Sequence, residues 1–451
     1  MSTETFSRLA LGALVVGLAL HNAAMAQLWE VGVRGTPLDV LAAWKEALLL
    51  AALVAVAWKV RRLPIATAAD VLALAYAAVI VVYVLVPSGW LDGDATSRGE
   101  LLALRHHLLP VAGYALGRLV SGWWRPERLG IVVALTAGGL ALIGLLDLGL
   151  ISLQAWRDSG VPSWYREQLG LDYEGLTGLP ENWVYNTGDE TNPIRRLVST
   201  FLSPLASAYV FVVALVYVAS RPFRWWWALL GLLLYAGLLY THTRAAIAAL
   251  AVGLVVLAVA ERRPAPAVLA AASVAVAAAF FVAYPEIGPS TSYTQEELEY
   301  LRANAEENPG TSTDPFSTNE SSLASHWRNL RDGVQAVVEH PQGYGLGNAG
   351  VVAKRTGVDI RAGESTYLEI GVDAGIAGLV AFLLWNVAIL VGLWRRQAWL
   401  AASFAAVLLL GLQTDVIGVH WLAVAVWGLA GMALGRPAGA EPQSEAEPAA
   451  S

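Results

Sequence analysis

Arginines recur at the polar ends of several apolar segments, and they are the residues best suited to bind a phosphate group. Arg195 and Arg196 close a long polar segment, Arg244 ends the short turn 241–244 between two apolar runs, and Arg328 lies in a later polar segment. A guanidinium presents a planar fork of N–H donors that matches phosphate oxygens. Arginines from separate helices that converge on one cleft would form a diphosphate site that needs no metal. For the turn at Arg244, the alternative is a side chain that only snorkels to the membrane surface.

Glu364 is the candidate general base. It opens a long apolar segment in the run Glu364-Ser365-Thr366-Tyr367-Leu368. A carboxylate at the start of a helix can simply complement the helix dipole. If it faces the arginines instead, it can remove a proton from a sugar hydroxyl.

Other ionisable groups lie inside apolar runs, where they are energetically expensive and therefore candidates for function. Lys45 and Glu46 are adjacent, and a mutual or snorkelling pair is the alternative interpretation. Arg105, His106 and His107 follow one another near Pro110, which indicates a wet cavity. The candidates for the lining of a cleft or for an acceptor site are the following polar residues: Lys45, Arg105, His106, His340 and Tyr367.

The polar segment 285–363 contains two expected helices and a glycine-rich loop. Thr294 and Glu297 have the spacing of a capping box, which predicts a helix over 295–304. Apolar positions recur at helical spacing over 325–339, and this helix is expected to lie along the membrane surface and cover a cleft. A solvated face is the plainer alternative. The loop 340–348 is rich in glycine but lacks the GxxxxGK pattern of a phosphate loop.

The composition identifies the elements that must position these residues. Of 451 residues, 56% are hydrophobic and 14% are charged, whereas soluble domains carry about 25% charged residues. A membrane-spanning helix needs about 20 apolar residues. We therefore predict an all-α polytopic membrane protein with about 12 transmembrane helices, from the following apolar runs: 9–26, 39–60, 66–86, 101–120, 129–150, 199–219, 225–240, 245–260, 267–284, 365–393, 398–412 and 417–434.

The runs and the polar segments between them divide the chain into six parts. Lys or Arg follows every even-numbered run, so the positive-inside rule predicts that those connections and both termini are cytoplasmic. The two long polar segments then form inserts on the opposite side of the membrane. The predicted parts are transmembrane helices 1–5 (1–151), a first insert (152–198), helices 6–9 (199–284), a second insert (285–363), helices 10–12 (364–435) and a disordered tail (436–451).

Several classes of function are excluded or disfavoured. The chain has no cysteine, so disulfides, thiolate metal sites and cysteine nucleophiles are impossible. The formal net charge of -7 argues against nucleic acid as a partner, because phosphate backbones need a concentrated positive surface. A nucleotide-binding glycine motif of the Walker or dinucleotide type is also absent from the sequence.

The order of these motifs resembles that of the O-antigen ligase and O-antigen polymerase family of bacterial inner-membrane proteins. Four features match in sequence order: the Arg-x-x-x-(Ser/Thr)-Phe-x-(Ser/Asn)-Pro run over 196–204, the Thr-x-(Ser/Thr)-Arg turn ending at Arg244, the His-Pro-x-Gly-x-Gly-x-Gly-Asn loop from His340, and the helix that opens at Glu364. The agreement is strongest between Arg195 and Gly378.

The resemblance implies an integral-membrane glycosyltransferase of the GT-C type that works on the periplasmic face of the inner membrane. Such enzymes move a glycan from undecaprenyl diphosphate to an acceptor, without a nucleotide sugar and, in the ligases, without a metal or other cofactor. The resemblance assigns donor diphosphate binding to Arg196 and Arg244, and less directly to Arg195 and Arg328. The acceptor is a lipid A-core in the ligases and another lipid-linked glycan in the polymerases.

The chain departs from the ligase pattern at one position. Ligases carry a His-(Asn/Ser/Gln)-x-x-Leu pattern at the helix that follows the second insert, and here Glu364 stands in place of that His. Glutamate can also accept a proton, so the transfer chemistry survives. The acceptor stays open between lipid A-core, a lipid-linked glycan and a protein. The alternatives from other classes are a transporter or flippase for a lipid-linked oligosaccharide, and a structural scaffold.

Overall fold

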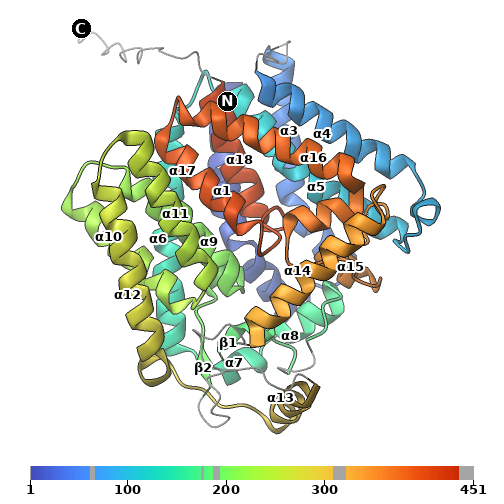
Figure 1. Cartoon of the computed structure of the whole chain (residues 1–451), viewed down its shortest axis with the longest axis vertical. Coiled ribbons are helices and arrows are strands. Elements are labelled where there is room, and N and C mark those ends of the chain that lie inside the picture. The colour runs from blue at the N-terminus through green and yellow to red at the C-terminus, as the bar shows by residue number, and fades with distance from the viewer. Residues whose placement is uncertain (1, 61–66, 174–176, 186–192, 308–320, 436–451) are drawn as a thin grey trace.

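The computed structural model describes residues 2–60, 67–173, 177–185, 193–307 and 321–435, and most of them form α-helices (Figure 1). The predicted tail 436–451 lies outside the described residues. A helix occupies each of the twelve apolar runs. These helices are α1 (Thr3–Glu30), α2 (Thr36–Ala42) with α3 (Trp44–Val60), α4 (Ala68–Leu85), α5 (Ser97–Val120), α6 (Pro126–Leu150), α9 (Pro204–Ala219), α10 (Trp225–Tyr240), α11 (Arg244–Glu261), α12 (Ala265–Ile287), α16 (Thr366–Trp394), α17 (Ala398–Leu410) and α18 (His420–Leu434).

Fewer of these helices than expected are typical membrane spans. Among the described residues, six helices are long and apolar enough to cross a membrane, or seven if α2 and α3, which are bent by 41°, count as one broken span. Four apolar helices are shorter, namely α9, α10, α17 and α18. The helix α5 has 24 residues but carries charged and imidazole side chains. The chain is thus a multi-pass helical membrane protein, while the count of twelve spans and the GT-C type stay predictions.

The first insert forms a small layer of short elements below the bundle. They are α7 (Leu153–Arg157), α8 (Val161–Ser163), η2 (Trp164–Gln168), η4 (Glu181–Trp183), and the antiparallel strands β1 (Val184–Tyr185) and β2 (Ile194–Arg195). A separate hydrophobic cluster that includes Trp29, Trp164 and Trp183 holds this layer against the end of α1. In Figure 1, α1 begins and α18 ends at the top, whereas α7, α8 and both strands lie at the bottom.

The second insert contains α13 (Gln295–Glu307), α14 (Ser321–Glu339) and α15 (Gly350–Thr356). The predicted capping box is present, because the Thr294 backbone N–H donates to Glu297 at 2.7 Å and the Glu297 backbone N–H donates to the Thr294 hydroxyl at 3.2 Å. Glu297 also forms an ion pair with Arg157 at 2.6 Å. That buried pair ties the second insert to the first. The helix predicted over 325–339 is confirmed as part of α14.

The helix α18 lies at the centre of the bundle and packs most extensively against α5. Glycines make this close approach possible. A Cβ atom at Gly117 would lie 1.9 Å from the Gly428 carbonyl oxygen, and one at Gly431 would lie 2.2 Å from the Tyr114 carbonyl oxygen. Small residues commonly allow helix backbones to approach in membranes. A side chain at either position would force α5 and α18 apart.

The glycine-rich loop 340–348 inserts into a kink of α16. Backbone angles are non-helical at Ala374 and Gly375, and the freed backbone groups bond to the loop: Ile376 N–H donates to Pro341 C=O at 2.9 Å and Tyr344 N–H donates to Val372 C=O at 2.7 Å. The loop is therefore a packing element of the helix that follows it. This agrees with its lack of a phosphate-loop pattern.

Gly343→Ala is expected to lower the free energy of unfolding by about 2 kcal/mol or more, because it combines overpacking with an unfavourable backbone conformation. Gly343 has φ +75°, and a Cβ atom there would lie 2.5 Å from the Gly375 backbone nitrogen. Unfolding in detergent, followed by tryptophan fluorescence, measures the effect. Gly139→Ala is the matched control, because nothing lies within 4 Å of a Cβ atom at that position of α6. Equal stability of the two variants would contradict the tight fit of the loop.

Candidate functional site

Two of the predicted arginines meet at the turn between α10 and α11. Arg196 directly follows β2, and its backbone N–H donates to the Trp183 carbonyl oxygen at 2.8 Å. The Arg196 guanidinium donates to the Thr241 carbonyl oxygen at 2.8 Å and to the Thr243 hydroxyl at 3.2 Å. Arg244 is the first residue of α11, so its cation lies at the positive end of a helix dipole. The turn between α10 and α11 thus brings together two guanidinium groups and a helix N-terminus.

The two cations repel each other. Burial, together with the charge of Arg244, lowers the pKa of Arg196 to about 10, so its guanidinium is still charged at neutral pH. Among the described residues, Arg196 forms no ion pair with a carboxylate. A pair of like charges held together in this way is a favourable environment for an anion, because an anion would relieve their repulsion.

His242 lies between these arginines in an aromatic enclosure. Its ring centroid is 4.1 Å from that of Tyr185, 4.7 Å from that of Tyr284 and 4.5 Å from that of Phe281. Burial and the neighbouring arginines lower the pKa of His242 to about 3, so the ring is neutral. Its Nε2 atom is buried and has no hydrogen-bond partner among the described residues. The site therefore contains a buried polar atom that no described residue satisfies.

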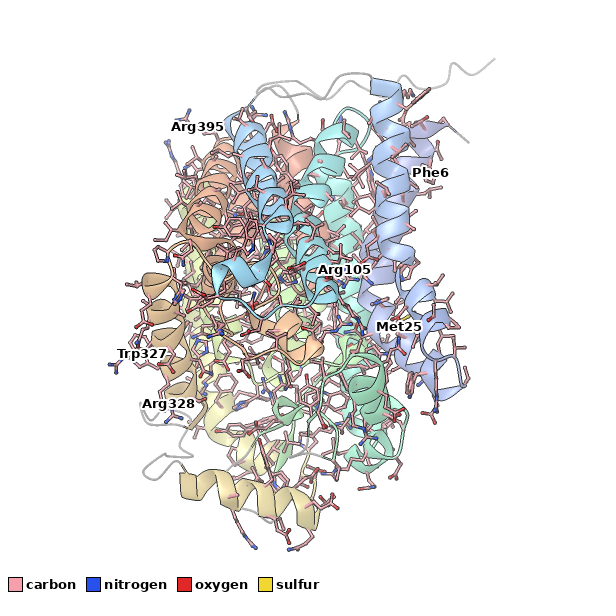
Figure 2. All side chains as sticks on the ribbon, turned by 90° about the vertical axis from the view of Figure 1, so that its right-hand side faces the viewer. Phe6, Met25, Arg105, Trp327, Arg328 and Arg395 are labelled. Atoms are coloured by element: carbon pink, nitrogen blue, oxygen red, sulfur yellow. The ribbon has the colours of Figure 1, made fainter. Side chains whose placement is uncertain are left out.

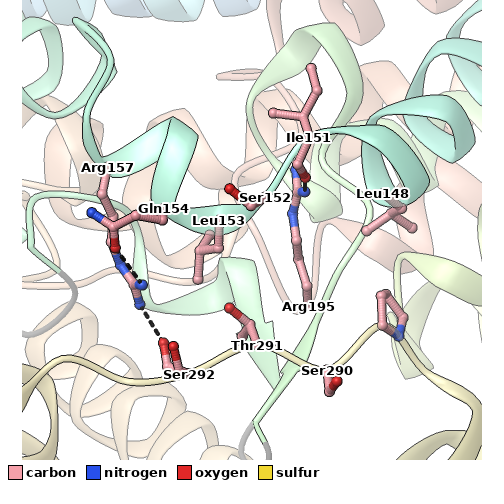
Figure 3. A pocket seen from close by; sticks show the side chains of 11 residues that line it. Leu148, Ile151, Ser152, Leu153, Gln154, Arg157, Arg195, Ser290, Thr291 and Ser292 are labelled. Atoms are coloured by element: carbon pink, nitrogen blue, oxygen red, sulfur yellow. Dashed lines mark hydrogen bonds between the residues drawn. The ribbon is translucent and has the colours of Figure 1, made fainter.

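Arg195 points away from this site. Its guanidinium forms an ion pair with Asp147 at 2.5 Å and also donates to the Ile151 carbonyl oxygen. Figure 3 shows the side chain running from β2 toward Ile151, along the wall of a cavity of about 330 Å³. The other cation of that cavity, Arg157, is also held, by Glu297 and by the Ser292 carbonyl oxygen. The predicted role of Arg195 in donor binding loses its geometric basis.

Arg328 is exposed on α14. Figure 2 shows Arg328 and Trp327 at the left edge of the molecule, below Arg395, which lies near the top on the same side. The exposed side chains of Trp327, Val334 and Val338 form an apolar stripe along this helix. That stripe is the surface that a membrane would contact in the predicted orientation.

Glu364 faces α14. Its Oε2 atom lies 2.7 Å from Nδ1 of His326, and the side chain is 46% exposed, compared with 15% for His326. The hydrogen bond from His326 lowers the pKa of the Glu364 carboxyl group, against the opposing effect of burial. Glu364 has φ +62°, a left-handed conformation that is rare for a residue with a side chain. Such local strain is common at functional sites, where the surrounding packing maintains it.

The non-helical segment 411–419 connects Glu364 to the arginine site. The Thr366 backbone N–H at the start of α16 donates to the Gly411 carbonyl oxygen at 3.0 Å, and the Thr366 hydroxyl donates to the Thr414 carbonyl oxygen at 3.0 Å. Thr414 also forms a side-chain hydrogen bond with Tyr209 of α9, which interacts electrostatically with Arg196. One segment therefore touches both the start of α16 and the surroundings of Arg196.

A buried polar cluster lies on the other side of the same segment. His106 is 3.2 Å from Asp415, and His107 is 3.0 Å from Asp373. Glu369 completes the set, because one ligand atom from each of His106, Glu369 and Asp415 lies within 4.8 Å of the other two. Among the described residues, these three are a possible ligand set for a metal ion. The expectation that no metal is needed stays a prediction.

Lys45 and Arg105 share Glu46. The carboxylate is 3.6 Å from Lys45 and 3.4 Å from Arg105, and Lys45 also donates to the Ala42 carbonyl oxygen at 2.8 Å. The Nζ atom of Lys45 lies 3.2 Å from the ring of His21. The mutual pair that the sequence left as an alternative is thus present, and it includes a second cation.

Two further candidates make local contacts. The His340 ring is stacked on Tyr344 at 4.2 Å and hydrogen-bonded to its hydroxyl at 2.7 Å. The Tyr367 hydroxyl donates to the Leu408 carbonyl oxygen of α17 at 2.7 Å. Both side chains stabilise the packing around them. The structure brings together Arg196 and Arg244, and separately His106 with Asp415. It also places Nε2 of His340 3.9 Å from the exposed carboxylate of Asp92.

Part of the chain matches a known protein family. Residues 227–383 match the family model described as O-antigen ligase. The matched region contains Arg244, the loop 340–348, Glu364 and the kink of α16. No curated protein matches the chain.

Proposed function

We propose that this chain, of which residues 227–383 match the O-antigen ligase family model, is a glycosyltransferase that takes a glycan from undecaprenyl diphosphate. The acceptor is a hydroxyl group on lipid A-core, as in an O-antigen ligase. The reaction takes place at the periplasmic face of the inner membrane, with both termini in the cytoplasm. It needs neither a metal nor another cofactor.

The observation that carries the proposal is the pairing of Arg196 with Arg244 around the turn 241–243. Both cations belong to segments that precede or begin a membrane helix, and no described carboxylate neutralises Arg196. A diphosphate carries the charge and the oxygen atoms that such a pair recognises. The apolar helices around the turn suit the polyprenyl chain, which enters from the bilayer.

The reaction is a displacement at the anomeric carbon. The bond from that carbon to the diphosphate oxygen breaks as the bond to the acceptor oxygen forms, and the electron pair leaves with undecaprenyl diphosphate. Arg196 and Arg244 stabilise the charge that develops on this leaving group, in a partly dry site where such stabilisation is strong. The proton of the acceptor hydroxyl passes to the hydrogen-bonded pair of Glu364 and His326.

A transfer assay with purified protein tests the proposal. The protein is incubated in detergent with a fluorescent undecaprenyl-diphosphate oligosaccharide, first alone and then with lipid A-core. We expect a single new product only when lipid A-core is present. A ladder from donor alone would show a polymerase, whose acceptor is a second lipid-linked glycan, and transfer only to an added polypeptide would show protein ligation.

A transporter predicts a different result. It would return the donor with unchanged mass in detergent, and it would move intact donor across a liposome membrane. The chelator EDTA is added to one set of reactions. Unchanged transfer with EDTA supports the absence of a metal, whereas loss of transfer that added divalent cation restores would assign a role to His106, Glu369 and Asp415.

A further inference from the structure

We propose that His326 is the proton acceptor of the transfer reaction and that Glu364 is the residue that positions it. This inference rests on the proposed function, and it assigns the general base to a side chain that the sequence pattern did not indicate. Its basis is the juxtaposition of a histidine on α14 with a carboxylate that precedes α16, 38 residues later in the chain.

The geometry separates the roles of the two histidine nitrogens. Nδ1 of His326 is 2.7 Å from Glu364 Oε2. In the neutral ring Nδ1 therefore carries the proton and donates a hydrogen bond to the ionised carboxylate. Nε2 then keeps its lone pair. This atom is shielded by the protein and has no hydrogen-bond partner among the described residues. A bound acceptor must displace the groups that cover Nε2, and its hydroxyl then meets a lone pair for which no described residue competes.

Glu364 is less suited to be the base. The hydrogen bond from His326 stabilises its ionised form and lowers its pKa, which makes the carboxylate a weaker proton acceptor. A carboxylate in this position instead fixes the histidine tautomer and stabilises the imidazolium that forms when Nε2 takes up a proton. The proton of the sugar hydroxyl thus ends on Nε2, and it leaves to water after the product departs.

Packing of α14 on the start of α16 holds the pair together. Gly333 of α14 allows this contact, because a Cβ atom there would lie 2.9 Å from Leu368. On the other side, the start of α16 is bonded to Gly411 and Thr414. Glu364 is therefore fixed between α14 and the segment that contacts Tyr209, near Arg196.

Among the described residues, the charged groups close to His326 lie on α14 and around the start of α16. Glu364 approaches it from the segment before α16, and Glu369 of α16 interacts electrostatically with Glu364. The nearby cations on α14 itself, Arg328 and Arg331, are exposed. A change in the pH dependence of the rate therefore reports mainly on the pair of His326 and Glu364.

Two substitutions of His326 test the role of Nε2 while they preserve different parts of the side chain. His326→Asn keeps a donor at the position of Nδ1 and removes Nε2. His326→Ala leaves space for added imidazole. We expect both to reduce kcat by about 100-fold or more, with KM for donor changed less than threefold. Imidazole should restore part of the rate of His326→Ala and leave the wild-type rate unchanged.

Variants of Glu364 and a matched control complete the experiment. In wild-type protein the rate should fall at low pH as His326 becomes protonated. Glu364→Gln should keep this fall but shift it to lower pH, because the imidazolium loses its counter-charge. Glu364→Asp should recover part of the rate. Gln335→Ala changes an exposed residue of the same helix whose side chain donates a hydrogen bond to Glu339, and it should keep the wild-type profile. Size-exclusion chromatography in detergent and measured unfolding temperatures identify any variant that has lost its fold.

The outcomes separate the two claims. A wild-type rate and pH profile for His326→Asn would overturn the assignment of His326. The assignment would also be overturned if the fall in rate at low pH disappeared in Glu364→Gln but stayed in the His326 variants. If His326→Ala is folded, failure of imidazole to restore any rate would also count against it. Absence of transfer by the wild-type protein with every acceptor would overturn the proposed function itself.

Discussion

Arg244→Ala is expected to reduce the rate of glycan transfer by about 100- to 1,000-fold, the range observed when one preorganised donor to a developing anion is removed. The side chain lies at the first position of α11, beside Arg196 and the neutral His242. Its loss removes both charge and N–H donors from the leaving-group site. The rate is measured with labelled undecaprenyl-diphosphate glycan at saturating lipid A-core.

A lysine at this position should rescue little of the rate, because an ammonium group does not reproduce the planar fork of a guanidinium. Arg263→Ala is the matched control, because Arg263 is an exposed arginine just beyond the other end of α11 and pairs with Glu261. It should transfer at the wild-type rate. Full activity of a folded Arg244→Ala variant would remove Arg244 from the site.

Asp147→Ala is expected to lower the free energy of unfolding by about 3–5 kcal/mol, the cost of leaving one partner of a buried ion pair without its counter-charge. The side chains of Asp147 and Arg195 are 7% and 3% exposed. Unfolding in mixed detergents, followed by tryptophan fluorescence, gives the change. The double variant Asp147→Leu with Arg195→Met should recover most of the stability, because similarly sized apolar side chains can replace a buried pair.

This prediction also separates the two adjacent arginines. If Arg195 bound the donor, Asp147→Ala would weaken donor binding and leave the unfolding curve in place. That result would contradict the structural role assigned to the pair.

The twelve apolar runs could be predicted from hydropathy, and each contains a helix, although several are shorter than the about 20 residues that a bilayer requires. The interruptions within and between them could not. The segment 411–419 and the stretch Ser199–Ser203, which begins with a 3-10 helix over Ser199–Phe201, depart from α-helical geometry. Tertiary partners such as Thr366 and Leu140 hold them in place. Hydropathy alone therefore does not show which of the runs form long, uninterrupted helices.

The arginine site was predictable in part. Arg244 is predictable because its turn follows an odd-numbered run, on the side of the membrane where the positive-inside rule requires no positive charge. Arg196 is predictable from the motif over 196–204. Arg195 was grouped with Arg196, although neighbouring side chains at a strand point to opposite sides. Only the contacts of the folded chain show which of the two arginines faces the turn 241–243: Arg196 donates to Thr241 and Thr243, whereas Arg195 pairs with Asp147.

The partners of Glu364 and His106 escaped the sequence analysis for a physical reason. His326 is 38 residues from Glu364, and its place on an amphipathic helix gave no sign of which side chain it would meet. Asp415 lies in a short polar stretch between two apolar helices, where it resembled an ordinary connection. Contacts between distant segments of this kind depend on how the helices pack.

The most direct test of the account is the amount of undecaprenyl diphosphate released for each glycan transferred. Purified protein is incubated with donor and acceptor in detergent containing EDTA, and both products are quantified by mass spectrometry. The account predicts one undecaprenyl diphosphate for each new glycosidic bond, and none from Arg244→Ala above background. Recovery of all the donor intact with each of the three acceptor classes, from a folded protein that moves the same lipid across liposomes, would contradict it.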